Sequence, residues 1–265
     1  MFTRPARELI ASSATTGWAV FLLGLPLVAK TGNHADIPRR EVRALLFVLA
    51  AHLEPMSREQ LCFLFWPHMP ECSARRALSH LLTHLRRALD SNVAVLTWDD
   101  QIELDPEHVW SDAVAFERLI TGTGGPRNVD ALKQATELYR GPFLSGFSLN
   151  TSEEFEVWVL QERQIWERLC LEALAVLIEE HTMCHEYSAA IKYAQRYLDT
   201  DDLAEDVHRR LIELYIALGD RTAAIRQFEN CAAVLGRELG VNPQPMTWAA
   251  YQVALGTLPL TLPPR

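Results

Sequence analysis

A row of hydrogen-bond donors lies along one predicted helix, from Ser73 to Asp90. Its apolar residues recur at helical spacing and form one stripe: Ala74, Leu78, Leu81, Leu82, Leu85 and Leu89. Away from that stripe lie Arg75, Arg76, Ser79, His80, Thr83, Arg86 and Arg87. Guanidinium, hydroxyl and imidazole groups in this pattern can bind phosphate oxygens and base edges. A surface helix whose arginines are only solvated has the same pattern, so the neighbouring elements in the sequence must distinguish the two interpretations.

The basic charge is concentrated in the first third of the chain. The 265 residues carry a net charge of −9 at pH 7. Up to Asn92, 11 basic and 7 acidic residues give +4, whereas the remainder has 14 and 27, which gives −13. Although the whole chain is acidic, its N-terminal part is therefore basic and suits a polyanionic partner. With 49% hydrophobic and 22% charged residues, the composition excludes disordered and collagen-like classes.

Other clusters of reactive side chains do not complete a catalytic or metal site. His181, Cys184 and His185 are three potential zinc ligands beside Glu180, but no second cluster supplies a fourth ligand. The glycine-rich loop at residues 122–126 lacks the lysine and the preceding strand of a phosphate loop. An acidic run fits a solvated helix face: Glu153, Glu154 and Glu156, with Glu162 and Glu167 further on. We therefore predict no bound metal, no cofactor and no enzymatic activity.

The chain has the features of a cytosolic protein. Five cysteines without paired spacing fit buried thiols in a reducing compartment. An apolar run from Trp18 to Ala29 follows Arg4 and Arg7, as in a secretion signal, but Gly24-Leu25-Pro26 interrupts it. Residues 1–17 are expected to be a flexible leader. No segment is long enough to cross a bilayer, so no membrane association is predicted.

The first hundred residues predict strands, three helices and a hairpin. Strands are expected at residues 19–23 and 27–30, with a third that includes Asp36 and Ile37. Apolar residues from Val42 to Leu53 indicate a first helix, a capping box of Ser57 and Gln60 opens a second, and residues 73–90 form the third. Residues 93–97 and 101–104 read as a hairpin. This order predicts a winged helix-turn-helix, in which the third helix enters the major groove and the hairpin is the wing.

The second half contains an internal repeat whose offset is the tetratricopeptide period of about 34 residues. Ala189-Ala190-Ile191 recurs as Ala223-Ala224-Ile225, and Leu177-Ile178 recurs as Leu211-Ile212. Further helices are expected at residues 111–120, 129–139, 153–180 and 246–254. Such a stack of helix pairs buries one core and exposes a concave face suited to protein contacts.

Several motifs together resemble those of the bacterial transcriptional activator domain family, the SARP-like or antibiotic-regulatory-type activators. In the first half they are Met56-Ser57-Arg58-Glu59-Gln60-Leu61, Leu64-Phe65-Trp66-Pro67, Ala74-Arg75-Arg76-Ala77-Leu78 and Leu85-Arg86-Arg87-Ala88-Leu89. In the second half they are Val114-Ala115-Phe116-Glu117-Arg118-Leu119, Leu138-Tyr139-Arg140-Gly141-Pro142-Phe143-Leu144 and Glu238-Leu239-Gly240-Val241-Asn242-Pro243. The resemblance implies an activator that binds directly repeated promoter elements as a dimer and recruits RNA polymerase.

These observations predict a mainly α protein in which two domains follow the leader. Residues 18–106 form a winged helix-turn-helix with a small β-sheet, and residues 110–256 form a tetratricopeptide-like activator domain. Residues 257–265 are a tail, or a linker if the chain continues into an ATPase and sensor region as in large family members. The predicted phosphate contacts are Arg58, Arg75 and Arg86, and the predicted base contacts are Arg76, Ser79, His80, Thr83 and Arg87.

One departure from the family pattern concerns the wing, whose tip carries Asp99 and Asp100. Because DNA phosphates repel carboxylates, we expect this wing to stand away from DNA or to touch the polymerase. The acidic wing and the acidic second half also suit an alternative function, a protein-interaction adaptor in signalling without sequence-specific DNA binding.

Overall fold

The computed structural model describes residues 17–90, 94–122 and 128–257. Outside these ranges lie the predicted leader (except Gly17), the start of the first wing strand, most of the loop at 122–126 and the tail from residue 258. The chain divides into two compact units: Met1–Pro126 with Gln134–Leu169, and Arg127–Lys133 with Cys170–Arg265. The first unit thus joins the predicted winged helix to the beginning of the predicted activator domain.

A four-stranded sheet forms one part of the first unit. Its order is β3 (Asn33–His34), β2 (Leu27–Lys30), β1 (Trp18–Phe21) and β7 (Val109–Ser111), and β1 runs antiparallel to β2 but parallel to β7. The expected third strand at Asp36 and Ile37 is wrong. Thr31 and Gly32, both with positive φ, turn the chain at once, so that β3 begins at Asn33. Strand β7 was not predicted.

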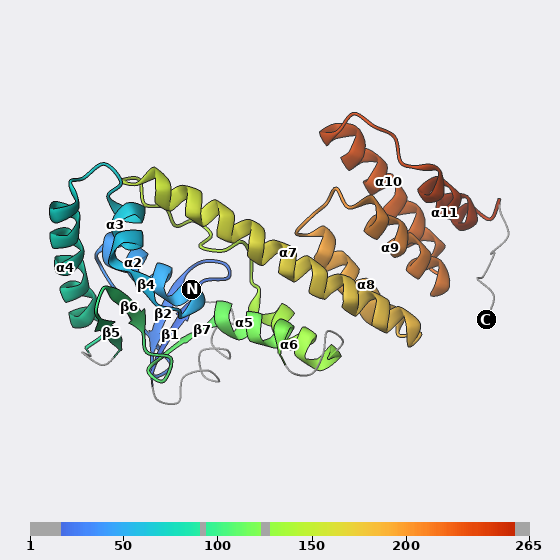
Figure 1. Cartoon of the computed structure of the whole chain (residues 1–265). Coiled ribbons are helices and arrows are strands. Elements are labelled where there is room, and N and C mark those ends of the chain that lie inside the picture. The colour runs from blue at the N-terminus through green and yellow to red at the C-terminus, as the bar shows by residue number, and fades with distance from the viewer. Residues whose placement is uncertain (1–16, 91–93, 123–127, 258–265) are drawn as a thin grey trace. The chain divides into compact units, whose positions relative to one another are not determined.

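Three helices follow, as the sequence predicts: α2 (Arg40–His52), α3 (Arg58–Phe65) and α4 (Glu71–Ala88). Helix α2 is buried on nearly all sides and packs against α4 and α5 (Asp112–Thr121). The capping box is confirmed, because the backbone N–H of Gln60 donates to Ser57 Oγ (3.1 Å) and that of Ser57 donates to Gln60 Oε1 (2.9 Å). The three helices pack in the arrangement expected of a helix-turn-helix (Figure 1).

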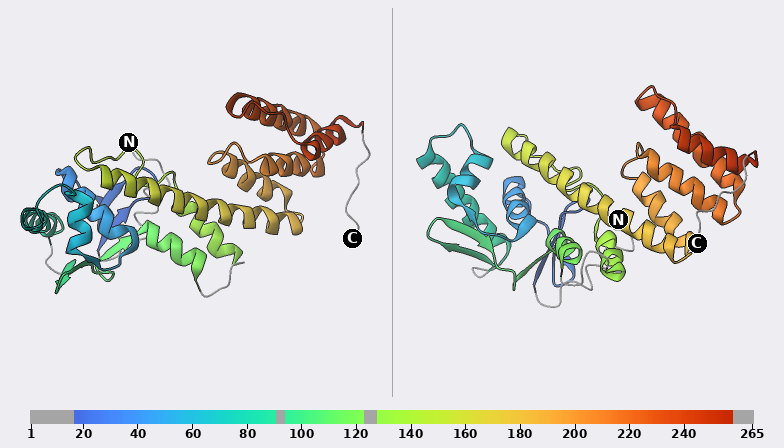
Figure 2. Two further views of the ribbon diagram at one scale, coloured as in Figure 1. Left: turned by 45° about the horizontal axis from the view of Figure 1, so that its top comes forward. Right: turned by 45° about the vertical axis from the view of Figure 1, so that its right-hand side comes forward.

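The hairpin is present and has a third strand. Strands β5 (Val95–Trp98) and β6 (Gln101–Leu104) pair antiparallel around a turn at Asp99 and Asp100. Strand β4 (Met56–Ser57) pairs with β6 and so attaches the hairpin to the start of α3. The hairpin and α4 lie side by side in all views (Figures 1 and 2).

The segment that follows α6 (Val129–Leu138) returns to the first sheet. The backbone N–H groups of Arg140 and Leu144 donate to the carbonyls of Leu23 (3.2 Å) and Leu22 (2.8 Å). Gly24 has φ +120°, and an added Cβ would lie 3.2 Å from Arg140 Cβ, so this approach requires glycine. The Arg140-Gly141-Pro142-Phe143-Leu144 motif therefore packs against the end of β1 within the first unit.

A buried carboxylate joins the end of α2 to helix α7 (Glu153–Met183), whose first half belongs to the first unit. Glu162 was expected on a solvated face, but it is buried, because His52 and Trp166 supply partners for its carboxylate. Its oxygens lie 3.1 Å from His52 Nε2, and Oε2 accepts a hydrogen bond from Trp166 Nε1 at 2.9 Å. The hydrogen bond to Glu162 raises the pKa of His52 against the opposing effect of burial, and the charges of Glu117 and Glu54 add to the rise.

This pair predicts a stability that falls with rising pH. A histidine whose pKa is raised by folding stabilises the fold fully below about pH 6.5, its ordinary value, and that stabilisation is lost as the pH rises through the raised pKa. Because His52 is partly exposed, we expect the thermal midpoint to fall by only about 2 °C between pH 6 and pH 9 from this cause. His52→Gln should remove this part of the pH dependence; an identical slope for both proteins would contradict it.

The second unit contains the internal repeat of the sequence. Its helices are the second half of α7, α8 (Tyr187–Leu198), α9 (Glu205–Ala217), α10 (Arg221–Glu238) and α11 (Pro245–Leu255). The ends of α7 and α9, and likewise the starts of α8 and α10, are separated by the tetratricopeptide period. The packing positions Leu211, Ala224 and Phe228 are buried, and α9 packs against α8, α10 and α11. The predicted helix pairs are confirmed.

The two repeats also share one turn. In the first, the backbone N–H of Glu186 donates to the His181 carbonyl (2.8 Å), and in the second that of Asp220 donates to the Tyr215 carbonyl (2.9 Å). The residue before each donor has a positive φ, 60° at His185 and 80° at Gly219.

Candidate nucleic-acid interface

Helix α4 is held in place by its apolar stripe. Its leucines from Leu78 to Leu89 are at most 5% exposed, and the helix packs against α2 and α3. Its C-terminal end is attached to the first sheet, because Trp18 Nε1 donates to the Leu89 carbonyl at 2.9 Å. A helix fixed in this way presents its opposite face to solvent with little freedom to rotate.

That opposite face carries an outer row of four exposed side chains, Arg76, His80, Thr83 and Arg87. At about 100° and 1.5 Å per residue, the row spans an arc of roughly 60° and a length of about 16 Å. Within the described part of the chain, Arg76 and Arg87 form no ion pair. Two unpaired guanidinium groups three turns apart can address base edges at two separate positions along one groove.

Ser79 and Thr83 are bonded to their own helix. Ser79 Oγ donates to the Arg75 carbonyl and Thr83 Oγ1 to the Ser79 carbonyl, both at 2.9 Å. Each hydroxyl oxygen keeps lone pairs, so these residues can still accept hydrogen bonds from amino groups of bases.

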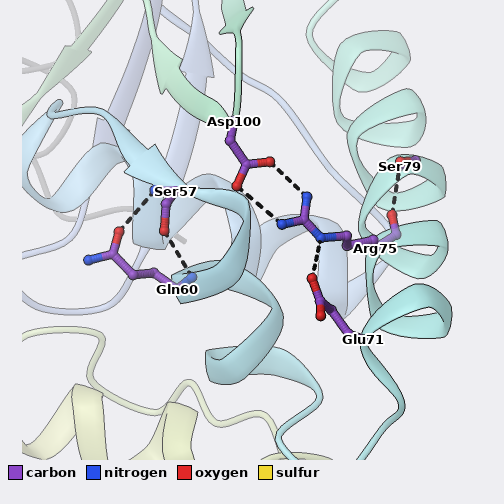
Figure 3. Close-up of polar contacts among 6 residues, drawn as sticks. All are labelled: Ser57, Gln60, Glu71, Arg75, Ser79 and Asp100. Carbon is purple, nitrogen blue, oxygen red and sulfur yellow. Dashed lines mark hydrogen bonds and ion pairs between the residues drawn. The ribbon is translucent and has the colours of Figure 1, made fainter.

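Arg75 is engaged by two carboxylates of the protein. Its Nη1 and Nη2 donate to the two oxygens of Asp100 at 2.7 and 3.3 Å, and its Nε donates to Glu71 Oε1 at 3.0 Å (Figure 3). The Arg75 guanidinium holds the pKa of the Asp100 carboxyl below its ordinary value. The charge of Asp100, one of the two aspartates at the tip of the wing, is therefore offset in part by a guanidinium that it shares with Glu71. In the described residues, Asp99 has no cationic partner.

Arg86 makes a second connection to the hairpin. Its Nη2 lies 3.1 Å from Thr97 Oγ1 and 3.4 Å from the Val95 carbonyl, both on β5. Two of the three predicted phosphate contacts, Arg75 and Arg86, are thus bonded within the protein. These contacts could not be predicted from the helical pattern, because the pattern gives the direction of a side chain around the helix but not its hydrogen-bond partner.

Two further arginines, Arg58 and Arg39, lie at helix starts. Arg58, the third predicted phosphate contact, is the first residue of α3, and its backbone N–H donates to the Asp100 carbonyl at 2.8 Å. Burial lowers the pKa of His84, and the charges of Arg39, Arg87 and His80 lower it further. Arg39 was not among the predicted contacts, although a run of arginines before α2 signals it. It is exposed and adds a charge beside the polar face of α4.

The two histidines considered as metal ligands have other partners. His181 Nδ1 lies 2.5 Å from Glu186 Oε2, and the His181 ring stacks on Tyr193. His185 Nδ1 lies 2.8 Å from the Tyr187 hydroxyl. Across the described ranges, no three His, Cys, Asp or Glu side chains are grouped to hold a metal ion.

The family is decided by the second half of the chain. Residues 112–255, more than half of the sequence, match the model of the bacterial transcriptional activator domain. The chain belongs to this family. The model describes a domain of transcriptional activators.

The fold agrees with that family. A solved structure of Mycobacterium tuberculosis EmbR, in complex with a low-affinity phosphopeptide, matches 92% of this chain with a TM-score of 0.64 and 20% identity. The chain covers 66% of that structure, just under two thirds of its length. No curated protein matches the chain. Among the described helices, none is long and apolar enough to cross a membrane.

Proposed function

We propose that this regulator binds promoter DNA through α4 and activates transcription by recruiting RNA polymerase. The observation that carries the proposal is the outer row, whose two arginines are exposed and unpaired in the described chain on a helix fixed by its opposite face. In the proposed complex Arg76, Ser79, His80, Thr83 and Arg87 meet base edges, and Arg58 and Arg39 meet phosphates.

The remaining parts of the proposal concern the whole protein. Residues 18–106 act as the DNA-binding domain, and residues 110–256 as the helical domain that mediates dimerisation or control on directly repeated sites. The protein works in the cytosol and needs no cofactor. The basic charge of the N-terminal part supports this division.

An adaptor function in signalling is the alternative, and a feature of the second unit favours it. A groove of about 260 Å³ is lined by charged side chains that include Glu179, Asp206, Arg210 and Glu213. Such a groove on a helical repeat can bind a peptide. In that case α4 would serve protein contacts and would bind DNA without sequence preference.

Selection of genomic fragments followed by salt titration distinguishes the two functions. We expect the protein to enrich specific fragments, and the plot of log affinity against log salt concentration to fall with a slope of about −0.9 per phosphate contact. With Arg39 and Arg58 as phosphate contacts, the slope per protomer should be about −2, and it should reach about −4 only if Arg76 and Arg87 also neutralise phosphates. If no fragment is enriched over bulk DNA, the regulator proposal fails and the adaptor function stands.

A further inference from the structure

The arginines of α4 occur as two adjacent pairs, Arg75-Arg76 and Arg86-Arg87. The pairs are separated by about three helical turns, so equivalent members lie within about 20° of each other around the helix. Within a pair, the two side chains are about 100° apart. Helix α4 therefore carries two parallel rows of arginine.

The two rows have different surroundings. Arg75 is bonded to Asp100 at the tip of the hairpin and to Glu71, whereas Arg86 is bonded to Thr97 and Val95 on strand β5. The first arginine of each pair thus binds the hairpin: Arg75 contacts its turn, and Arg86 contacts its edge strand β5. The second members, Arg76 and Arg87, are exposed.

We propose that Arg75 and Arg86 are positioning residues that fasten the wing to the recognition helix, and that only Arg76 and Arg87 of the four remain for DNA. We call the contacts of Arg75 and Arg86 the wing clamp. The proposal rests on the DNA-binding function proposed above. In the proposed complex the wing lies beside the DNA bound to α4, contrary to the expectation from its acidic tip. The clamp fixes the hairpin there before binding, so that ordering the wing costs no affinity when α4 meets DNA.

Two neighbouring aspartates supply a matched test. Asp99→Asn and Asp100→Asn remove the same negative charge from adjacent positions of the turn, but only Asp100 takes part in the clamp. We expect Asp99→Asn to strengthen binding to a selected fragment about twofold, because one repulsive charge is lost. Asp100→Asn should weaken binding on the order of fivefold, because the clamp opens. Strengthened binding by Asp100→Asn would show that Arg75 is released to DNA, which would overturn the proposal.

Salt dependence separates a positioning residue from a phosphate contact. Arg75→Ala should lower affinity at every salt concentration and leave the salt slope unchanged, whereas loss of a phosphate contact would reduce its magnitude by about 0.9. The losses from Arg75→Ala and Asp100→Ala should not add in the double variant, because both open the same clamp. A reduced slope or additive losses would contradict the proposal.

Hydrogen exchange of the free protein tests the clamp even if no DNA is bound. We expect faster exchange of the backbone amides in residues 95–104 of Asp100→Asn than of Asp99→Asn, at thermal midpoints close to that of the wild type. Equal exchange in the two variants would refute the clamp. The clamp and the DNA-binding function can also be told apart. If exchange is slow only in the wild type and Asp99→Asn, but the selection experiment enriches no DNA fragment, the clamp is supported and the DNA-binding function is rejected.

Discussion

Replacing Arg76 and Arg87 together by alanine is expected to abolish discrimination between a selected promoter fragment and bulk DNA. Each bidentate contact of arginine with guanine contributes about 1–3 kcal/mol of discrimination, so the double variant should lose about 2–6 kcal/mol. Both side chains are exposed, and the free energy of unfolding should therefore change by less than about 0.5 kcal/mol. Competition binding with labelled promoter and unlabelled bulk DNA measures the loss.

A matched control separates base contact from charge. Arg118→Ala with Arg237→Ala removes the same charge from exposed sites outside α4, and should leave discrimination intact. Arg76→Lys with Arg87→Lys keeps both charges but loses the planar fork of donors, so it should lose discrimination while the salt slope is retained. Wild-type discrimination by the double alanine variant would show that α4 is not the recognition helix.

Elements with local signals were predictable from the sequence. The capping box of Ser57 and Gln60 places the start of α3, and the leucine spacing places α4, because both depend on residues three or four positions apart. The tetratricopeptide offset predicted the helix pairs of the second unit, because each repeat forms the same turn.

Contacts between distant segments were not predictable in the same way. Strand β7 is short and pairs with β1, which lies far away in the sequence, so no periodicity marks it. Helical geometry placed Arg75 and Arg86 on the polar side of α4 but could not show that Asp100, in the hairpin, would bind Arg75. The sequence accordingly predicted a stronger repulsion between the acidic wing and DNA than the structure indicates.

Asp112 illustrates how such contacts join the two predicted domains. It is fully buried at the start of α5, where its carboxylate accepts hydrogen bonds from the backbone N–H groups of Leu22 (2.6 Å) and Leu23 (3.2 Å). The same carboxylate pairs with Arg140 Nη2 at 3.0 Å. Burial raises the pKa of Asp112, while Arg140 and the two backbone groups oppose the rise. One side chain thus connects β1, α5 and the segment after α6.

Asp112→Ala is therefore expected to destabilise the first unit by about 3–5 kcal/mol, the cost of leaving a partner of a buried ion pair uncompensated. Asp112→Asn should cost less, because its amide oxygen can still accept one backbone hydrogen bond. Asp112→Ala with Arg140→Leu should recover part of the loss, since no unpaired charge remains. Urea unfolding measures all three. A change below about 0.5 kcal/mol in Asp112→Ala would mean that the packing of Trp166 on His52 and Phe143, rather than this ion pair, joins the winged helix to the activator domain.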